Sequence, residues 1–236
     1  STGSSDFLEF CGIRLFADKE LVRQGLEKFH FGYTDALDTR YKSIHVQTHL
    51  AARLAHMNDI IGPITNPIHL RLMKRRVLGV NHLIEPRVIA DAYQLLNEKG
   101  ITQVEQGLFV RGFVDKERNG GIDEISIFDG GTSVAELKNR KVDVYDLYAN
   151  DFGIPVQEYS EPPKGKEGKA RFSKKILEGK VVGMPRDLIL ANTAIIYYLA
   201  QGICLEEGFQ RARDVLESGK PYCNLKKYAA FVGGQD

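Results

Sequence analysis

A strand, a helix and a second strand follow one another between residues 76 and 110, and this pattern constrains the fold more than any other feature of the chain. Apolar residues predict a buried strand at 76–80, and Pro86 opens a predicted helix over 86–98 that ends before Gly100. Residues 104–110 predict the second strand. A strand–helix–strand unit of this length pairs its strands in parallel. The sequence therefore predicts an α/β fold with a mainly parallel sheet flanked by helices.

Further elements are predicted on both sides of this unit. A loop running into a strand is predicted over 120–127, and an antiparallel ribbon over 132–147 with its turn at Asn139-Arg140. The polar stretch 160–169, dominated by Pro, Gly and Lys, predicts a mobile surface loop. Helices are expected near residues 7–11, 18–29, 44–57, 170–179, 186–201 and 205–218.

Composition excludes several classes of protein. With 32 basic and 31 acidic residues the net charge is +1, so no overall field favours nucleic acid or a membrane. Three widely spaced cysteines fit a reducing compartment better than a disulfide framework. No apolar run reaches the roughly 18 residues of a membrane span, and no signal-peptide pattern is present. We therefore expect a cytoplasmic protein without a membrane partner.

Several motifs, in chain order, resemble the anthranilate phosphoribosyltransferase family, a part of glycosyltransferase family 3. Residues 2–12 are similar to its S-G-S-A-D-x-L-E-x-L-G element, residues 62–67 to its G-P-L-x-N-P loop and residues 121–126 to its G-x-D-E-x-S element. Smaller matches are residues 77–80, the Asp-Phe-Gly at 151–153, Asn192-Thr193-Ala194, and the stretches 205–208 and 218–220.

This resemblance implies a fold, a domain plan and an activity. Residues 1–15 would begin an α/β domain that binds phosphoribosyl diphosphate, residues 16–60 would belong to a helical domain, and residues 61–236 would complete the α/β domain. The implied enzyme uses Mg²⁺ and transfers a phosphoribosyl group from phosphoribosyl diphosphate to an aromatic amine or heterocyclic nitrogen, an acceptor similar to anthranilate. A homodimer is also implied, because the family usually dimerises through its helical domain.

The sequence departs from the family pattern in two places. The family's G-T-G-G-D loop and K-H-G-N segment precede its S-G-S element, whereas this sequence opens inside that element with Ser1, so we expect a divergent, processed or truncated member without the N-terminal segment. The family's His-Pro pair and its acceptor-binding Arg have no counterpart between Phe31 and Asn58, and the Arg position falls near His49 or Leu50. The identity of the acceptor therefore stays open.

Asp123 and Glu124 are the candidate metal ligands. They are adjacent on a glycine loop at the predicted entrance to a strand. Hard cations bind carboxylate oxygens, and departure of diphosphate needs a cation to neutralise it. The resemblance implies that this pair holds Mg²⁺ on the diphosphate; the alternative is a solvated acidic pair at a strand edge. No Ser-His-Asp set, cysteine nucleophile or Walker loop is present, so no catalytic residue is assigned.

Gly3 and Ser4 are the candidate residues for binding phosphoribosyl diphosphate. They precede a predicted helix, where free N–H groups and the helix dipole favour a phosphate. The resemblance implies a phosphate contact from Ser4. N-capping of the helix explains the same serine, and the two roles are compatible. Asn66 has a turn role in its Thr-Asn-Pro loop, and the resemblance places it near the active cleft.

Candidates for the acceptor site and for a different function remain. His45, His49 and His56 share one face of the helix predicted at 44–57. The His45–His49 pair could bind a metal, but the sequence shows no third ligand for it. A second hypothesis is that His49 or Arg53 replaces the family's Arg in binding the acceptor; chance placement on a helix is the alternative. The basic residues between Arg71 and Arg76 predict a solvated surface. They also support the alternative function, a catalytically inactive relative that binds nucleic acid or another partner.

Overall fold

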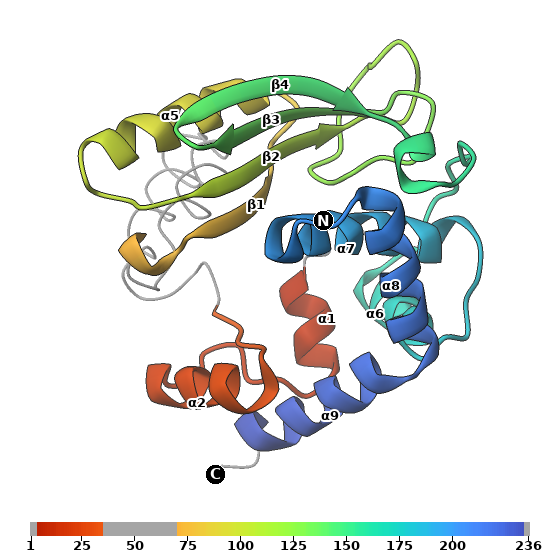
Figure 1. Cartoon of the computed structure of the whole chain (residues 1–236). Helices are drawn as coiled ribbons and strands as arrows, with labels where there is room; N and C mark the ends of the chain where they lie inside the picture. Colours follow the sequence, from red (N-terminus) through yellow and green to blue (C-terminus); the bar gives the residue numbers. More distant parts are fainter. Residues whose placement is uncertain (1–3, 35–69, 234–236) are drawn as a thin grey trace, which may run out of the picture. The chain divides into compact units, whose positions relative to one another are not determined.

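The computed structural model describes residues 4–34 and 70–233, which form two compact units. The first unit combines Ser1–Gln47, Ser160–Gly183 and Asp214–Asp236, and the second combines Thr48–Tyr159 and Met184–Arg213. Figure 1 labels the α-helices and strands of both units. The domain bounds expected from the family, 1–15, 16–60 and 61–236, remain a prediction.

The second unit is built on a four-stranded sheet with the order β1-β2-β3-β4. Its strands are β1 (Arg75–Gly79), β2 (Gln106–Gly112), β3 (Thr132–Lys138) and β4 (Lys141–Leu147). Strands β1 and β2 are parallel, as the strand–helix–strand pattern predicts, with Val77 opposite Leu108. The α/β class is confirmed. The expectation of a mainly parallel sheet is wrong for the described strands, because β2–β3 and β3–β4 are both antiparallel.

The ribbon of β3 and β4 has the turn that its sequence predicts. Asn139 and Arg140 both adopt left-handed backbone conformations, with φ of 51° and 63°. A two-residue turn of this kind matches the right-handed twist of the strands it joins. The ribbon extends the parallel pair because β3 also pairs with β2, so the predicted strand pattern forms a single sheet.

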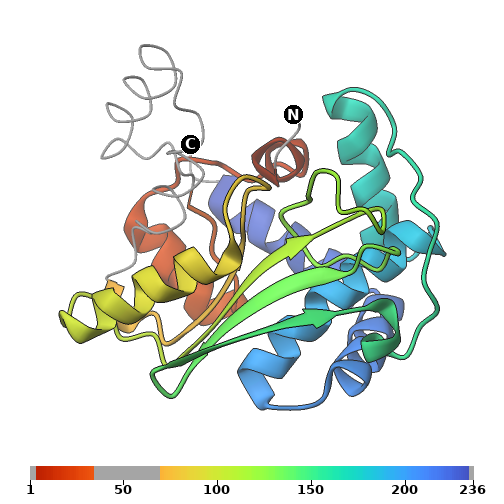
Figure 2. The same ribbon diagram turned by 90° about the horizontal axis from the view of Figure 1, so that it is seen from above.

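Helix α5 (Pro86–Glu98) covers one face of this sheet, as Figure 2 shows. The stacked rings of Tyr93 and Phe109, with centroids 5.2 Å apart, lie at the centre of the core. Burial of each large apolar side chain contributes about 1.5–3 kcal/mol. Packing against β2 and β3 therefore fixes the position of the helix. The core comprises Val80, Ile89, Ala90, Tyr93, Val104, Phe109, Ala135 and Leu137.

The other face of the sheet bears a buried polar cluster beneath α7 (Met184–Gln201). The carboxylate of Glu136 on β3 accepts hydrogen bonds from Gln106 (2.6 Å), Tyr145 (2.9 Å) and Tyr198 of α7 (3.0 Å). A buried carboxylate is tolerated when donors surround it in this way. The cluster therefore joins β2, β3, β4 and α7.

Shorter and more distant elements complete the second unit. They are η2 (Leu70–Leu72), η3 (Ala149–Phe152) and the first part of α8 (Leu205–Glu217), a helix that continues into the first unit. Within the described residues, no single helix is long and apolar enough to cross a membrane. Only α7 and α8 taken together meet the length and hydropathy criteria, and they meet at a bend of 113°.

The first unit is helical and has its own aromatic core. Its helices are α1 (Ser4–Phe10), α2 (Lys19–Phe29), α6 (Lys166–Leu177) and α9 (Lys220–Gly233). Asp18 caps α2 by accepting a hydrogen bond from the Glu20 N–H, as predicted. Tyr228 of α9 packs edge-on against Phe29 and Phe31, and its hydroxyl accepts a hydrogen bond from the Tyr33 N–H (3.2 Å).

Three expectations about secondary structure need comment. The predicted loop at 160–169 is wrong in its second half, because α6 begins at Lys166 and the Lys166 ammonium forms an ion pair with Asp6 at 2.9 Å. Helix α9 has no counterpart among the predicted elements. The helix predicted at 44–57 lies outside the described residues.

Candidate functional site

Asp123 and Glu124 lie on a loop at the carboxyl end of the parallel strands β1 and β2. Ile122, the residue before them, forms two backbone hydrogen bonds with Gly112, the last residue of β2, at 2.8 and 2.9 Å. The strand predicted here is wrong beyond Ile122, since the described chain pairs only at that isolated bridge and then continues as an extended loop. The physical reason is that side chains, described below, supply the backbone partners that a strand would obtain from a ladder.

Two glycines allow this loop to lie directly against the strand ends. A Cβ atom placed on Gly79, the last residue of β1, would lie 1.7 Å from the Asp123 carbonyl oxygen. A Cβ atom on Gly112 would lie 2.4 Å from the Glu124 carbonyl oxygen. Any side chain at either position collides with the loop backbone. We call Gly79 and Gly112 the glycine seat of the carboxylate pair.

Polar side chains hold the loop after the pair. Asn192 of α7 accepts a hydrogen bond from the Ile125 N–H at 2.9 Å and donates one to the Ile125 carbonyl at 3.2 Å. The Ser126 hydroxyl donates to the Phe113 carbonyl at 2.6 Å, and the Ser126 N–H donates to the Thr132 hydroxyl at 2.8 Å. These buried bonds fix the main chain on the C-terminal side of Glu124.

The pair concentrates negative charge without a cation of the described residues beside it. Neither carboxylate forms an ion pair or hydrogen bond with any other residue of the described chain, 4–34 and 70–233. Partial loss of water around Glu124, followed by the charge of Asp123, raises the pKa of Glu124 from 4.5 to about 6. Both side chains remain accessible to solvent, so a cation can reach them. Two adjacent carboxylates that are accessible and have no partner in the described chain suit a hard divalent cation.

Arg111, near the end of β2, is bonded to residues other than the carboxylate pair. The Arg111 guanidinium forms an ion pair with Glu85 at 2.7 Å and donates to the His82 carbonyl at 3.1 Å. It thereby ties the loop after β1 to β2. Among the described residues, no group of three His, Cys, Asp or Glu side chains forms a metal cluster. A cation at the pair would therefore keep water or substrate oxygens in its remaining positions, as Mg²⁺ usually does.

The other predicted site residues lie in the first unit or outside the described chain. Ser4 is the first residue of α1 and is exposed, while its neighbour Ser5 hydrogen-bonds the Tyr33 hydroxyl at 2.7 Å. Gly3, Asn66 and the candidates on the predicted 44–57 helix, namely His45, His49, Arg53 and His56, lie outside the described residues. The structure brings Asp123 and Glu124 together on one loop. Their roles and those of the other candidates remain predictions.

The basic residues between Arg71 and Arg76 have separate environments. Arg71 donates to the Gly100 carbonyl, and Lys74 contacts Gln103 at 2.9 Å and Glu105 at 3.4 Å. Arg76 lies half-buried with its guanidinium 5.4 Å from the centre of the Tyr93 ring. Of the two cluster residues that belong to β1, Arg75 is exposed and Arg76 is not. These sequence neighbours therefore differ in their partners and in their exposure.

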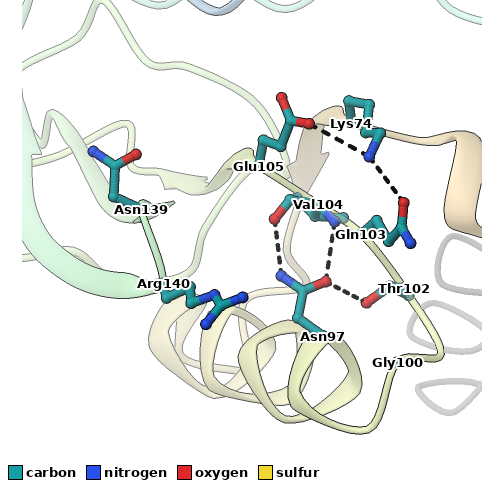
Figure 3. Close-up of a pocket in the computed structure, with 9 residues that line it drawn as sticks. All are labelled: Lys74, Asn97, Gly100, Thr102, Gln103, Val104, Glu105, Asn139 and Arg140. Atoms are coloured by element: carbon teal, nitrogen blue, oxygen red, sulfur yellow. Dashed lines mark hydrogen bonds and ion pairs between the residues drawn. The ribbon is translucent and has the colours of Figure 1, made fainter.

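A separate pocket opens at the amino end of β2, beside the turn between β3 and β4 (Figure 3). Its volume is about 450 Å³, and Lys74, Gln103, Glu105 and Arg140 contribute charged or polar groups to its lining. The Asn97 amide inside it is already occupied by Thr102 and by the main chain of Val104. The carboxylate pair lies at the opposite, carboxyl end of β2.

Sequence reasoning missed the residues that position the pair. Gly79 and Asn192 belong to motifs that resemble the family, but the motifs alone assign neither residue a role in the site. A glycine at the end of a buried strand is a signal for close backbone approach. No such signal marks Asn192, because its partner Ile125 lies 67 residues earlier in the chain.

Comparison with known proteins identifies the family to which the chain is similar. The model of the glycosyl transferase family a/b domain matches residues 1–222. An anthranilate phosphoribosyltransferase from Neisseria meningitidis serogroup C is 29% identical over 235 residues, which cover 98% of this chain and 62% of that relative. The chain thus spans less than two thirds of the length of this relative.

Solved structures agree in fold. The anthranilate phosphoribosyltransferase of Thermus thermophilus superposes with a TM-score of 0.75 at 27% identity, covering 98% of this chain and 64% of that one. The enzyme from Saccharomyces cerevisiae, in complex with PRPP and Mg, has a TM-score of 0.74 at 22% identity and covers 98% of this chain and 61% of that one. The family resemblance predicted from the motifs is confirmed. The chain belongs to the glycosyl transferase family defined by this a/b domain.

Proposed function

We propose that this chain belongs to a Mg²⁺-dependent phosphoribosyltransferase that transfers the phosphoribosyl group of phosphoribosyl diphosphate to an aromatic amine or heterocyclic nitrogen, an acceptor similar to anthranilate. The observation that carries the proposal is the carboxylate pair, held on the glycine seat with no cation of the described chain beside it. The relatives bearing the name anthranilate phosphoribosyltransferase support the reaction class. A cytoplasmic homodimer belongs to the same proposal.

Asp123 and Glu124 would hold Mg²⁺ against the diphosphate. In the reaction, the acceptor nitrogen uses its lone pair to form a bond to C1 of the ribose, the C1–O bond to diphosphate breaks, and its electron pair leaves with the diphosphate. The nitrogen then loses its proton to solvent. Mg²⁺ held by Asp123 and Glu124 would neutralise the charge that accumulates on the leaving group.

The remaining site residues have supporting roles in this proposal. Gly3 and Ser4 would contact the phosphate groups, and His49 or Arg53 would contact the acceptor. None of these groups forms a covalent bond to the substrate. The reaction depends on positioning and on leaving-group stabilisation.

The test is diphosphate release by the complete protein in the presence of Mg²⁺, phosphoribosyl diphosphate and anthranilate. Asp123→Asn removes one charge from the pair and is expected to lower the rate by about 100-fold or more, in the range seen when groups that stabilise transition-state charge are removed. The matched control is Asp129→Asn, because Asp129 is an exposed carboxylate on the same loop and pairs only weakly with Lys116, at 3.8 Å. Its rate should change less than about twofold.

Two results would contradict the proposal. One is the absence of diphosphate release with anthranilate and with a panel of aromatic amines and heterocyclic nitrogen acceptors. The other is an Asp123→Asn protein that keeps the rate of the Asp129→Asn control.

A further inference from the structure

We propose that Asn192 of α7 is a positioning residue for the carboxylate pair, and that its amide sets the loop so that Asp123 and Glu124 reach one cation. This inference rests on the proposed function, since it gives the pair a metal to hold. It concerns a residue that touches neither the metal nor the substrate. It acts through the main chain of Ile125.

The Asn192 amide takes the place of a neighbouring strand. Its oxygen accepts a hydrogen bond from the Ile125 N–H at 2.9 Å. Its nitrogen donates to the Ile125 carbonyl at 3.2 Å and to the Leu188 carbonyl at 2.9 Å. A side-chain amide that bonds both the N–H and the carbonyl of one residue reproduces the pairing of a β ladder. The third bond, to its own helix, fixes the amide orientation.

The pair lies between two anchors on the main chain. On its N-terminal side Ile122 is bonded twice to Gly112, and on its C-terminal side Ile125 is bonded twice to Asn192. Only Asp123 and Glu124 lie between these anchors. Removing the Asn192 anchor frees one end of the loop, so the two carboxylates lose their fixed separation.

Ile125 itself cannot compensate for the loss. Its side chain is fully buried, and the two bonds from Asn192 are the hydrogen bonds that the described chain gives its N–H and carbonyl. A buried main-chain group left without a hydrogen-bond partner destabilises the position that holds it. The loop is therefore expected to move toward water, which carries Glu124 away from its present position.

Thr193 provides a matched control on the same helix. It is half-buried, like Asn192, but its hydroxyl donates only to the Ile189 carbonyl of α7, at 2.8 Å. Thr193→Ala thus removes a polar side chain from the adjacent position without touching the loop. A general weakening of α7 would affect both variants.

The experiment measures binding of Mn²⁺, in place of Mg²⁺, to the complete protein with inorganic diphosphate, by the electron paramagnetic resonance of free Mn²⁺. Asn192→Ala is expected to weaken Mn²⁺ binding about tenfold, at the lower end of what loss of a supporting hydrogen bond does to metal sites. Thr193→Ala should change it less than about twofold. Hydrogen exchange at residues 122–126 should accelerate in Asn192→Ala and stay unchanged in Thr193→Ala.

Asn192→Ser guards against a variant that does not fold. Serine keeps a polar group at this position, but its hydroxyl is too short to bond both Ile125 groups, so weaker Mn²⁺ binding and faster exchange are again expected. If Asn192→Ala and Asn192→Ser bind Mn²⁺ as the Thr193→Ala protein does, the positioning role is overturned. Asp123→Asn separates this failure from a wider one: if it also leaves Mn²⁺ binding unchanged, the metal site of the proposed function fails too.

Discussion

The loop raises the pKa of Glu124, and this shift has a measurable effect on stability. Partial loss of water around Glu124 and the charge of Asp123 raise its pKa from 4.5 to about 6, so the folded protein holds this proton more tightly than the unfolded chain does. Between pH 4.5 and 6 the folded state therefore loses stability as pH rises. Above this range the full penalty of the charged carboxylate remains.

Glu124→Gln should remove that pH dependence. In metal-free buffer, the variant is expected to gain stability relative to the parent protein as pH rises from about 4.5 to about 6, with a constant difference above that range. Urea denaturation at a series of pH values measures the difference in the free energy of unfolding. A difference that stays constant across pH 4–7 would show that the fold does not shift this carboxyl.

At the residue scale, the sequence revealed the chemistry of the site better than its support. Two adjacent carboxylates on a glycine loop indicate a cation from their identity alone. The glycine seat and Asn192 cannot be found in that way, because each acts on a residue far away in the chain. Gly79 meets Asp123 and Asn192 meets Ile125 only after the sheet and α7 have formed.

Among the elements, β3 carries the most connected buried charge of the described sheet. Glu136→Gln keeps the shape of this side chain but places an NH₂ group among donors from Gln106, Tyr145 and Tyr198. Hydrogen bonds to a charged group contribute about 1.5–3 kcal/mol, so we expect a loss of that size in the free energy of unfolding.

Urea denaturation measures this loss, and Glu105→Gln is its control. Glu105 is an exposed partner of Lys74 at 3.4 Å, and an ion pair of that kind contributes about 0–1 kcal/mol. Equal losses in the two variants would mean that the cluster beneath α7 contributes nothing beyond a surface pair.

Elements with strong local signals were predicted well, and those made by distant contacts were not. The bounds of α5 agree with the prediction because Pro86 and the residues after Glu98 mark both ends. Lys166, the first residue of α6, pairs with Asp6, which lies 160 residues away, and the loop after Ile122 is bonded to Asn192 of α7. Helix α9 was missed because Gly219 and Pro221 suggest the end of helical structure, although proline is favourable in the first turn.

On the scale of the whole molecule, the first unit depends on segments from both ends of the sequence. Helix α2 packs on α9 through Phe29 and Tyr228, which are 199 residues apart in the sequence. The second unit has a separate core around Tyr93 and Phe109. The two cores therefore respond differently to loss of the C-terminal helix.

A chain ended after Gly219 tests this dependence. Without α9, the apolar face of α2 loses its partner, and we expect amides at 19–29 to lose protection from hydrogen exchange while those of β2 and β3 keep theirs. A chain that lacks only residues 234–236 is the control. Retained protection in α2 would show that this helix is stabilised without α9.

The bonds from Asn192 also determine the order in which the site can form during synthesis of the chain. A ribosome adds Asp123 and Glu124 well before it adds Asn192, since Ile125 and Asn192 are separated by 67 positions. During that interval the chain contains both glycines and both carboxylates but not the residue that provides the second anchor. The nascent protein therefore acquires its acidic pair early, and can give that pair its final shape only after α7 has left the exit tunnel.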